Sequence, residues 1–453
     1  GDTLRFTLLC HNLAQIDTTV CYGAPFHFNG QTYLQDGTYY QIVNNTTYTL
    51  NIHYYPSREN IITTSILQGE DYYVNGIAYN TSGTYTLRFD TDQHGCDSMV
   101  ILTLFVTPTQ VSQWDGGAQP WVFGDGTPGN PYRIENAGQL AYMSNEINSN
   151  SNAYNGSYFE LVSDIDLNGY QWIGIGHSSS NPFQGHFDGN NHTIDNLNIT
   201  VTGSTPVYIG LFGYLDSASV QNVHIIGNGT IDLNTNNTVT YYVGPVAAYL
   251  NESQIINCSN TSDINITRTT SSTSTYNTYV GGINGYATGP LSLIDQTLSQ
   301  GVITYNFALN NSSSSYYYWY HYIGGISGYL NNGASIDNSG RVNPINILSN
   351  IIGYSKYSYV YTGGIAGYMT GSSTNRVSVR KSYNRGDINL SVLTNNTYTS
   401  SSYSMYSYVY AGGIAGYSSA YNTISDCYNR GLITPSLYAQ SSYSAAYATN
   451  NAY

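Results

Sequence analysis

Three carboxylates of this sequence could do chemistry if the fold brought them together: Asp164, Asp166 and Asp188, within SDIDLNG and FDGNNH. Such a group could bind calcium or supply the acids of a polysaccharide-cleaving enzyme. Asp and Asn side chains in turns, however, commonly satisfy backbone groups of their own loop. A polysaccharide lyase would also need a basic residue beside an acid, and Lys356 and Lys381 are the only lysines. We therefore expect structural turns here, with a calcium or catalytic role as the weaker hypothesis.

Other side chains with catalytic or metal-binding potential are sparse. His177, His186 and His192 fall close together, but their irregular spacing does not match a metal site. The chain contains no GxSxG, HExxH, phosphate-binding-loop or paired CxxC motif. The sequence therefore predicts no catalytic residue, no metal and no cofactor, as expected of a protein that is not an enzyme.

A repeated phrase organises the chain around these residues. The phrase is GGIxGY, found at 281–286, 324–329, 363–368 and 412–417. Two looser copies, IGLFGY and VGPVAAY, end at Tyr214 and Tyr249. The closing tyrosines recur every 35 to 49 residues, a drifting period typical of one structural unit with a loop of variable length.

Each unit contains short strand patterns separated by glycine and asparagine turns. The glycine phrase closes one strand, a segment such as ISDCYN forms a second, and a segment such as INLSV forms a third. Three short strands per unit predict one coil of a β-solenoid. The Tyr/Ser-rich stretch that follows varies in length, so we expect a surface loop or hairpin there.

Parallel coils would align equivalent tyrosines into two columns with a spacing of about 4.8 Å. The first column stands two residues before each glycine phrase, and the second closes the phrase. The members are Tyr242, Tyr279, Tyr322, Tyr361 and Tyr410 in the first, and Tyr214, Tyr249, Tyr286, Tyr329, Tyr368 and Tyr417 in the second. Either column could be structural, or could form an exposed aromatic strip that binds a sugar polymer or another protein. The face stays open, because the Gly-Gly pair can hold a bend.

The cysteines divide between the repeats and the N-terminal segment. Cys258 and Cys427 hold the same position four coils apart, or about 19 Å, whereas a disulfide needs Cα atoms within about 7 Å. Both are therefore predicted to be free thiols. Cys10, Cys21 and Cys96 allow one internal disulfide, and we favour Cys21 with Cys96, which would tie the first strands to the last.

Composition and charge exclude several classes of partner. Only 8% of the residues are charged, and the net charge of -14 is uneven: residues 1–239 carry -16 and residues 240–453 carry +2. A nearly neutral repeat region lacks the basic field that nucleic acid binding needs. No run of apolar residues is long enough to predict a membrane span.

The predicted fold class is all-β, with domain boundaries where the pattern changes. Residues 1–108 alternate short strands with turns, as in an immunoglobulin-like β-sandwich. Residues 109–135 form a linker and the entry to a cap, and residues 136–453 form a parallel β-helix with the GGIxGY repeats. A short helix near 136–148 should cover the first coil. Its apolar positions are Leu140, Met143 and Ile147.

The N-terminal segment resembles a known module. VCYGAPFHFNGQTY, GTYTLRF and GCDSMVILTLFV are similar to a repeated β-sandwich module of large proteins that Gram-negative anaerobes export by the type IX secretion route. The resemblance implies a spacer in an extracellular or cell-surface protein. Three short sites also resemble the O-glycosylation signal of the same kind of bacteria, with Thr18, Ser98 and Ser217 as acceptors.

The rest of the chain resembles the GLUG-type repeat proteins. The similar words are DIDLNGYQWIGIG, FQGHFDGNNHTIDNL, YIGLFGYL and the GGIxGY series. The resemblance implies a right-handed parallel β-helix of the pectin-lyase-like kind in a surface protein or adhesin. Two features depart from the family: Pro245 and Ala248 replace glycines in VGPVAAY, and the Tyr/Ser-rich segments are longer.

The printed sequence ends at Tyr453, where another glycine phrase would begin, and an unpaired strand edge readily accepts another strand. We therefore predict a non-enzymatic extracellular structural or adhesive surface protein, with head-to-tail assembly into a filament as an extension of that hypothesis. The alternatives are a carbohydrate-binding module that uses the tyrosine columns, and a β-helix lyase or glycosidase. Expected partners are another copy of the chain, a host or cell-surface protein, or a glycan.

Overall fold

The computed structural model is an all-β fold in two compact units, residues 1–110 and residues 111–453. The described part of the chain includes one α-helix and one short 3-10 helix. It comprises residues 12–21, 24–55, 59–67, 70–81, 83–89, 98–107, 114–205, 207–270, 275–311, 317–353, 356–397, 405–441 and 448–452.

The first unit contains two small three-stranded sheets and two hairpins. In one half β5 lies between β1 and β4, and β2 pairs with β3; in the other, β10 lies between β6 and β9, and β7 pairs with β8. The strands are β1 Asn12–Cys21, β2 Phe26–Phe28, β3 Gln31–Tyr33, β4 Gly37–Val43, β5 Thr46–Tyr55, β6 Glu59–Leu67, β7 Tyr72–Val74, β8 Ile77–Tyr79, β9 Gly83–Phe89 and β10 Ser98–Thr107.

The two halves repeat one motif, Asn-Gly-x-x-Tyr-x-x-x-Gly-Thr-Tyr, at a distance of 46 residues. Tyr39 and Tyr85 are its equivalent last residues, and each hydroxyl donates to the backbone carbonyl four residues earlier. Their rings pack on Tyr33 and Tyr79, with centroids 4.6 and 4.8 Å apart. Each half has its own hydrophobic cluster. The single sandwich expected over residues 1–108 is thus corrected to two successive small sheets, which share neither strands nor a hydrophobic cluster within the described residues.

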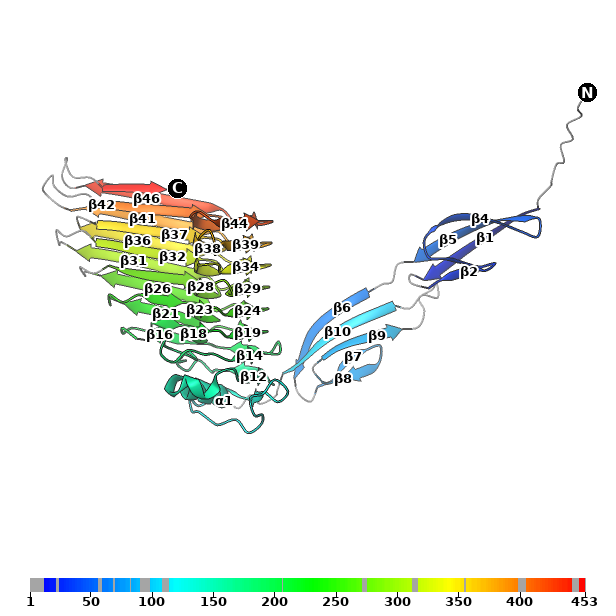
Figure 1. The fold of residues 1–453 in the computed structure, drawn as a ribbon, viewed down its shortest axis with the longest axis horizontal. Coiled ribbons are helices and arrows are strands. Elements are labelled where there is room, and N and C mark those ends of the chain that lie inside the picture. Colours follow the sequence, from blue (N-terminus) through cyan, green and yellow to red (C-terminus); the bar gives the residue numbers. More distant parts are fainter. Residues whose placement is uncertain are drawn as a thin grey trace, which may run out of the picture. The chain divides into compact units, whose positions relative to one another are not determined.

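A helix covers the start of the second unit, as the apolar spacing predicts. This helix, α1 Ala137–Ser149, is followed by the 3-10 helix η1 Ser151–Tyr154. The Asn136 side chain accepts a hydrogen bond from the backbone N–H of Gln139, which satisfies one free donor of the first turn. Its buried apolar residues include Leu140, Met143 and Ile147. In Figure 1 the helix lies at one end of the stacked strands.

The second unit is a parallel β-helix of five sheets, with strands stacked coil on coil (Figure 1). A coil passes through the sheets in the order in which they are numbered here. The first sheet contains β18 Phe212–Asp216, β23 Ala247–Asn251, β28 Asn284–Thr288, β33 Ser327–Asn331, β38 Ala366–Thr370 and β43 Ala415–Ser418. The second contains β11 Tyr132–Ile134, β12 Tyr158–Leu161, β14 His186–Asp188, β19 Ser219–Gln221, β24 Gln254–Ile256, β29 Leu293–Asp295, β34 Ser335–Asp337, β39 Val377–Arg380 and β44 Asn422–Ser425.

The remaining three sheets complete each coil. The third contains β13 Ile165–Asp166, β15 Thr193–Asp195, β20 His224–Ile226, β25 Ser259–Asn260, β30 Leu298–Ser299, β35 Gly340–Arg341, β40 Tyr383–Asn384 and β45 Tyr428–Asn429. The fourth contains β16 Ile199–Val201, β21 Thr230–Thr235, β26 Asp263–Thr270, β31 Ile303–Asn311, β36 Ile345–Gly353, β41 Ile388–Asn396 and β46 Ile433–Ser441. The fifth contains β17 Tyr208–Ile209, β22 Tyr241–Val243, β27 Tyr276–Gly281, β32 Tyr317–Gly324, β37 Lys356–Gly363, β42 Met405–Gly412 and β47 Ala448–Ala452.

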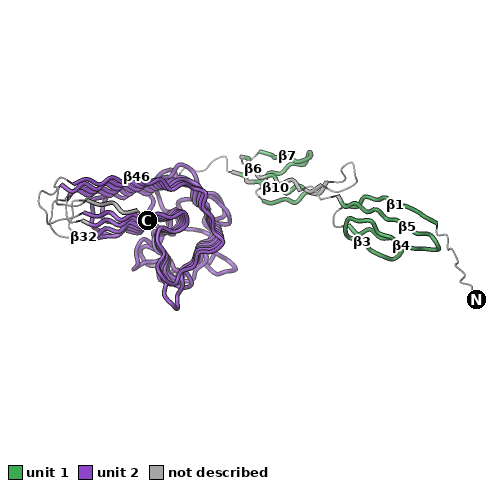
Figure 2. The backbone as a smooth tube through the Cα atoms, turned by 90° about the horizontal axis from the view of Figure 1, so that it is seen from above, with its two compact units in different colours: residues 1–110 green, residues 111–453 purple. Residues whose placement is uncertain are grey.

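Each coil from β18 onward therefore has five strands, in contrast to the predicted three strands with a loop or hairpin. The difference lies in the Tyr/Ser-rich stretches, which extend the fourth sheet and build the fifth. Fourth-sheet strands lengthen from three residues in β16 to nine in β31. From β26 onward these two sheets form a flat projection, here called the fin, which reaches away from the closed cross-section in Figure 2. Alternating Tyr and small residues suit a strand with two different faces.

The glycine phrase turns the chain from the fifth sheet into the first. A Cβ atom at Gly281 would collide with the carbonyl of Asn284, and one at Gly282 would collide with the carbonyl of Gly325 in the next coil. Backbones approach each other too closely at this corner for any side chain, which explains the paired glycines.

Candidate functional site

Two columns of stacked tyrosines run along the corner between the fifth and first sheets, at the predicted positions. In the first column, which begins one coil earlier at Tyr208, successive ring centroids are 4.9 to 5.3 Å apart and the planes differ by 6° to 15°. In the second column the spacing is 4.5 to 5.0 Å and the planes differ by 10° to 19°. These are offset-stacked rings, one per coil.

The two columns also contact each other edge to face. Tyr279 and Tyr286 have centroids 5.1 Å apart and planes at 83°. Tyr279 and Tyr361 are only 8% and 9% exposed, yet neither belongs to the hydrophobic cluster inside the β-helix. The columns therefore lie on the outer face of the β-helix and bury one another. The sequence alone did not determine which face they occupy. Burial raises the pKa of the Tyr214 hydroxyl to about 12.

A wider tyrosine array continues from the first column onto the outer face of the fin. We call it the tyrosine tile; its members are Tyr318, Tyr320 and Tyr322 in β32, Tyr357, Tyr359 and Tyr361 in β37, and Tyr406, Tyr408 and Tyr410 in β42. Equivalent rings in neighbouring strands are 4.8 to 5.3 Å apart. Neighbouring rings within a strand are 6.2 to 6.4 Å apart. The tile is therefore a two-dimensional lattice.

Six of these nine tyrosines are not among the predicted site residues. Their signal is present as YYYWYHY before the second full glycine phrase and as YSYVY before the third and fourth. Tyrosine at every second position indicates a strand with one aromatic face. A loop prediction for these stretches is incompatible with such a face, which is why the six tyrosines do not appear in the predicted columns.

Inside the fin, the fourth and fifth sheets enclose a fully buried arginine. Arg268 donates to the Thr278 hydroxyl at 2.9 Å and to the carbonyls of Asn237 and Val239 at 2.6 and 3.1 Å. Its guanidinium lies 4.0 Å from the ring centroid of Tyr276, a cation–π contact. These hydrogen-bond partners are all neutral, and burial lowers the pKa of Arg268. We interpret Arg268 as a structural plug between the two sheets.

The next coil places a buried histidine beside this plug. His321 Nδ1 lies 2.6 Å from the Tyr305 hydroxyl, and its ring packs 4.3 Å from that of Phe307. Burial lowers the pKa of His321 to about 3, with a smaller contribution from the Arg268 charge. The imidazole is therefore neutral in the folded protein, and it is out of reach of an external substrate.

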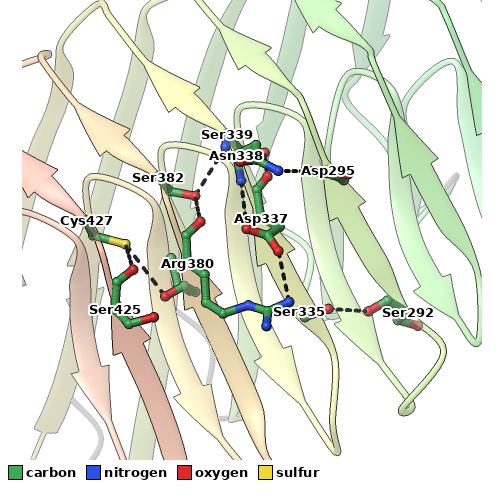
Figure 3. A network of polar contacts seen from close by, with 11 residues as sticks. Ser292, Asp295, Ser335, Asp337, Asn338, Ser339, Arg380, Ser382, Ser425 and Cys427 are labelled. Carbon is green, nitrogen blue, oxygen red and sulfur yellow. Dashed lines mark hydrogen bonds and ion pairs between the residues drawn. The ribbon is translucent and has the colours of Figure 1, made fainter.

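Polar side chains at the turn between the second and third sheets link successive coils (Figure 3). Arg380 pairs with Asp337 at 2.8 Å, and the Ser339 backbone N–H donates to the Ser382 hydroxyl at 3.2 Å. Cys427 occupies the column of Ser382, and its thiol contacts the Ser425 carbonyl at 3.1 Å. Cys258 and Cys427 are free thiols, and burial raises the pKa of Cys258 to about 12, so it remains protonated.

Two of the three candidate carboxylates, Asp166 and Asp188, are engaged in turns of their own loops, whereas Asp164 bonds to residues of the next coil. Asp164 accepts the backbone N–H of Thr193, while Asp166 and Asp188 accept those of Asn168 and Asn190. His192 lies 3.2 Å from Asp164, and hydrogen bonding and charge from this histidine help to lower the pKa of Asp164 against its burial. His186 instead contacts Ser219, with Nδ1 2.8 Å from its hydroxyl. Within the described residues, no three His, Cys, Asp or Glu side chains are placed to hold a metal ion.

The predicted disulfide and the predicted O-glycosylation sites stay predictions. Cys96 lies outside the described residues, as does Cys10, so the Cys21–Cys96 disulfide is not tested. Thr18 is partly exposed in β1, and Ser217 is exposed at a turn with φ of 54°. The side chain of Ser98 lies outside what the structure describes.

Comparison with known proteins gives two partial sequence matches. No family model matches the chain. A protein of Evansella cellulosilytica, provisionally named a Gly-rich membrane protein, is 33% identical over 136 residues, which is 28% of this chain and 14% of that protein. Halomucin of Haloquadratum walsbyi is 33% identical over 137 residues, 26% of this chain and 1% of its own length. The chain thus spans a small part of the relatives it matches.

One solved structure is weakly similar to the chain. It is a Bacteroides ovatus protein provisionally named an immunoglobulin A1 protease, 19% identical, matched over 70% of this chain and 86% of its own, with a TM-score of 0.38. This likeness is too weak to carry an argument about activity. Among the described residues, no helix is both long and apolar enough to cross a membrane.

Proposed function

We propose that this chain is a non-enzymatic structural and adhesive protein of the cell surface, with the tyrosine tile as its contact surface. The observation that carries the proposal is the tile itself: every outward position from Tyr318 to Tyr322, and at the paired positions of two further strands, is tyrosine. Tyrosine offers large contact area with a polar hydroxyl, and it is enriched in protein interfaces.

The β-helix suits such a role because it holds the tile rigidly. Each of the three tile strands, β32, β37 and β42, pairs in parallel with a strand on either side, and the stacked rings follow the same register. Little side-chain entropy then remains to be lost when a partner binds. The name of the Evansella relative supports a place at the membrane or surface, as does the scarcity of charged residues among the repeats.

Two other functions have weaker support. A sugar ring binds an aromatic side chain by lying on its face, but in the columns each inner ring is stacked on both sides, as Tyr279 is by Tyr242 and Tyr322. This geometry disfavours a glycan platform built on the columns. A lyase or glycosidase would need free carboxylates in one groove, whereas Asp166 and Asp188 satisfy the backbone of their own turns.

Adhesion of protein-coated beads tests the proposal. Beads carrying the full chain are expected to bind intact cells of the producing organism, or a mucin-coated surface. Beads carrying Tyr320→Asp with Tyr359→Asp should lose this binding. The matched control, Asn346→Asp with Asn389→Asp, changes outward residues on the opposite sheet of the fin.

The outcomes separate the proposed functions. Failure of wild-type beads to bind either target would contradict the adhesive role, and equal binding by both variants would remove the tile from it. Loss of binding on glycosidase treatment of the target would identify a glycan as partner. Labelling of intact cells with an antibody against the chain tests the surface location.

A further inference from the structure

We propose that the tyrosine tile binds a second copy of itself, so that the chain adheres to identical chains through their fins. This inference rests on the proposed adhesive function and names the partner. The occupant we infer is the tile of another molecule, packed face to face. Three features of the described residues favour it: the chemistry of the tile, its lattice and its lack of charge.

The tile is chemically self-complementary. A tyrosine hydroxyl both donates and accepts a hydrogen bond, so a surface of tyrosine hydroxyls can satisfy an identical surface without any other residue type. Tyr318 is 38% exposed, and Tyr320 and Tyr359 are partly exposed, so these rings reach the surface of the fin. A Lys- or Arg-bearing surface would not be matched by its own copy in this way.

The spacing of the tile favours a partner that is also a stack of β-strands. Equivalent rings repeat at 4.8 to 5.3 Å along the stack. This repeat follows from the distance between neighbouring strands, about 4.8 Å, and the spacing along a strand follows from two residues of extended chain. Two tiles share both repeats, so the side chains of one can fit between those of the other along the whole contact, as paired sheets do in steric zippers.

Charge does not oppose the contact. The tile contains no Lys, Arg, Asp or Glu at its outward positions, so two copies meet without like-charge repulsion. A twofold contact of this kind would place the same patch on both chains. Nine residues make a small interface, below the usual size of a stable dimer, so we expect weak single contacts that gain strength when many chains are displayed together.

Bead clumping with purified protein tests the inference in the absence of any cell or glycan. Beads coated with the full wild-type chain are expected to clump, and beads coated with Tyr320→Asp and Tyr359→Asp to stay dispersed. The Asn346→Asp and Asn389→Asp control beads should clump as wild type does. Circular dichroism and thermal unfolding check that each variant is folded.

A charge-pair rescue makes the test specific to contact between tiles. Beads with Tyr320→Lys and Tyr359→Lys should not clump alone, but should clump when mixed with the Tyr320→Asp and Tyr359→Asp beads. Dispersed wild-type beads, clumping that the tyrosine variants leave unchanged, or mixed beads that stay apart would each overturn the inference. Wild-type beads that bind cells but not one another would overturn it while leaving the proposed function in place.

Discussion

Tyr279 and Tyr286 lie seven residues apart on two successive sheets of one β-helix wall, with their rings perpendicular and 5.1 Å apart. Each also stacks on its equivalents in neighbouring coils, Tyr279 on Tyr322 at 4.9 Å and Tyr286 on Tyr329 at 5.0 Å. One pair thus joins two columns, and the columns brace the glycine corner from outside. Aromatic pairs of this geometry contribute about 0.5–1.5 kcal/mol each beyond their buried area.

Removing one ring from the second column should destabilise the β-helix. Tyr286→Ala loses two stacked neighbours and the edge-on contacts with Tyr242 and Tyr279, and we expect a loss of about 2–3 kcal/mol in the free energy of unfolding. Tyr286→Phe keeps the ring and loses the hydrogen bond that Asn331 donates to the hydroxyl, for about 1 kcal/mol. Chemical denaturation measures both, and similar values for the two variants would contradict a structural role of the stacked ring.

Stability should fall at alkaline pH. Burial raises the pKa of Tyr214 and of Tyr359 to about 12, above the value of about 10 for an unfolded tyrosine. Their contribution is complete below pH 10 and is lost as the pH rises from about 10 to about 12, because the unfolded chain releases these protons first. The thermal midpoint should decline over this range, together with late appearance of tyrosinate absorbance. Tyr214→Phe should make the decline shallower, and an unchanged slope would exclude this tyrosine.

Stability should also fall in acid. The pKa of His321 is lowered to about 3 in the folded protein, against about 6.5 when unfolded. Its contribution is complete above pH 6.5 and is lost as the pH falls from about 6.5 towards 3, because the unfolded chain takes up the proton first. The double variant His321→Val with Tyr305→Phe removes the pair, and valine occupies the equivalent positions 360 and 409. Unfolding curves of that variant should depend less on pH, and equal dependence would contradict the assignment.

Arg341, a buried arginine of the third sheet, can be replaced by the residue that occupies the equivalent position in the next coil. Arg341 occupies a column in which Asn384 bonds to the backbone of Gly386, two residues later. Burial lowers the pKa of Arg341 to about 9. We expect Arg341→Asn to change stability by no more than about 1 kcal/mol, because an amide can satisfy the turn without a buried charge. Arg341→Ala should cost about 3 kcal/mol, because it leaves Ser299 without its donor and opens a cavity. Thermal unfolding that ranks the two variants in the reverse order would contradict the column interpretation.

The sequence predicted the features that repeat at the same position in successive coils. Parallel strands repeat each position once per coil, so equal places in the glycine phrase predicted both tyrosine columns. The shared position of Cys258 and Cys427 likewise predicted two free thiols. Helical spacing predicted the cap, because Leu140, Met143 and Ile147 lie on one face of α1.

Other features depend on contacts between segments whose relative positions cannot be predicted from the sequence. The repeat in the first unit is only eleven residues long and resembles the other turn motifs of the segment. The strand pattern therefore predicted one sandwich where the structure has two small sheets. The composition of the Tyr/Ser-rich stretches predicted loops. These stretches form strands because they pair with strands of neighbouring coils, and an isolated strand would not be stable. No local pattern shows that pairing.

By itself, the sequence determined that the chain is all-β, that its coils repeat and which tyrosines share a column. The reason is that parallel strands in register place equivalent residues of successive coils next to each other. Only the tertiary structure decided that the columns lie outside the core and that the fin displays a tyrosine lattice. The physical reason is the glycine corner: the backbone bends between Gly281 and Asn284, where strand alternation is broken, so a side chain's face depends on how two sheets meet.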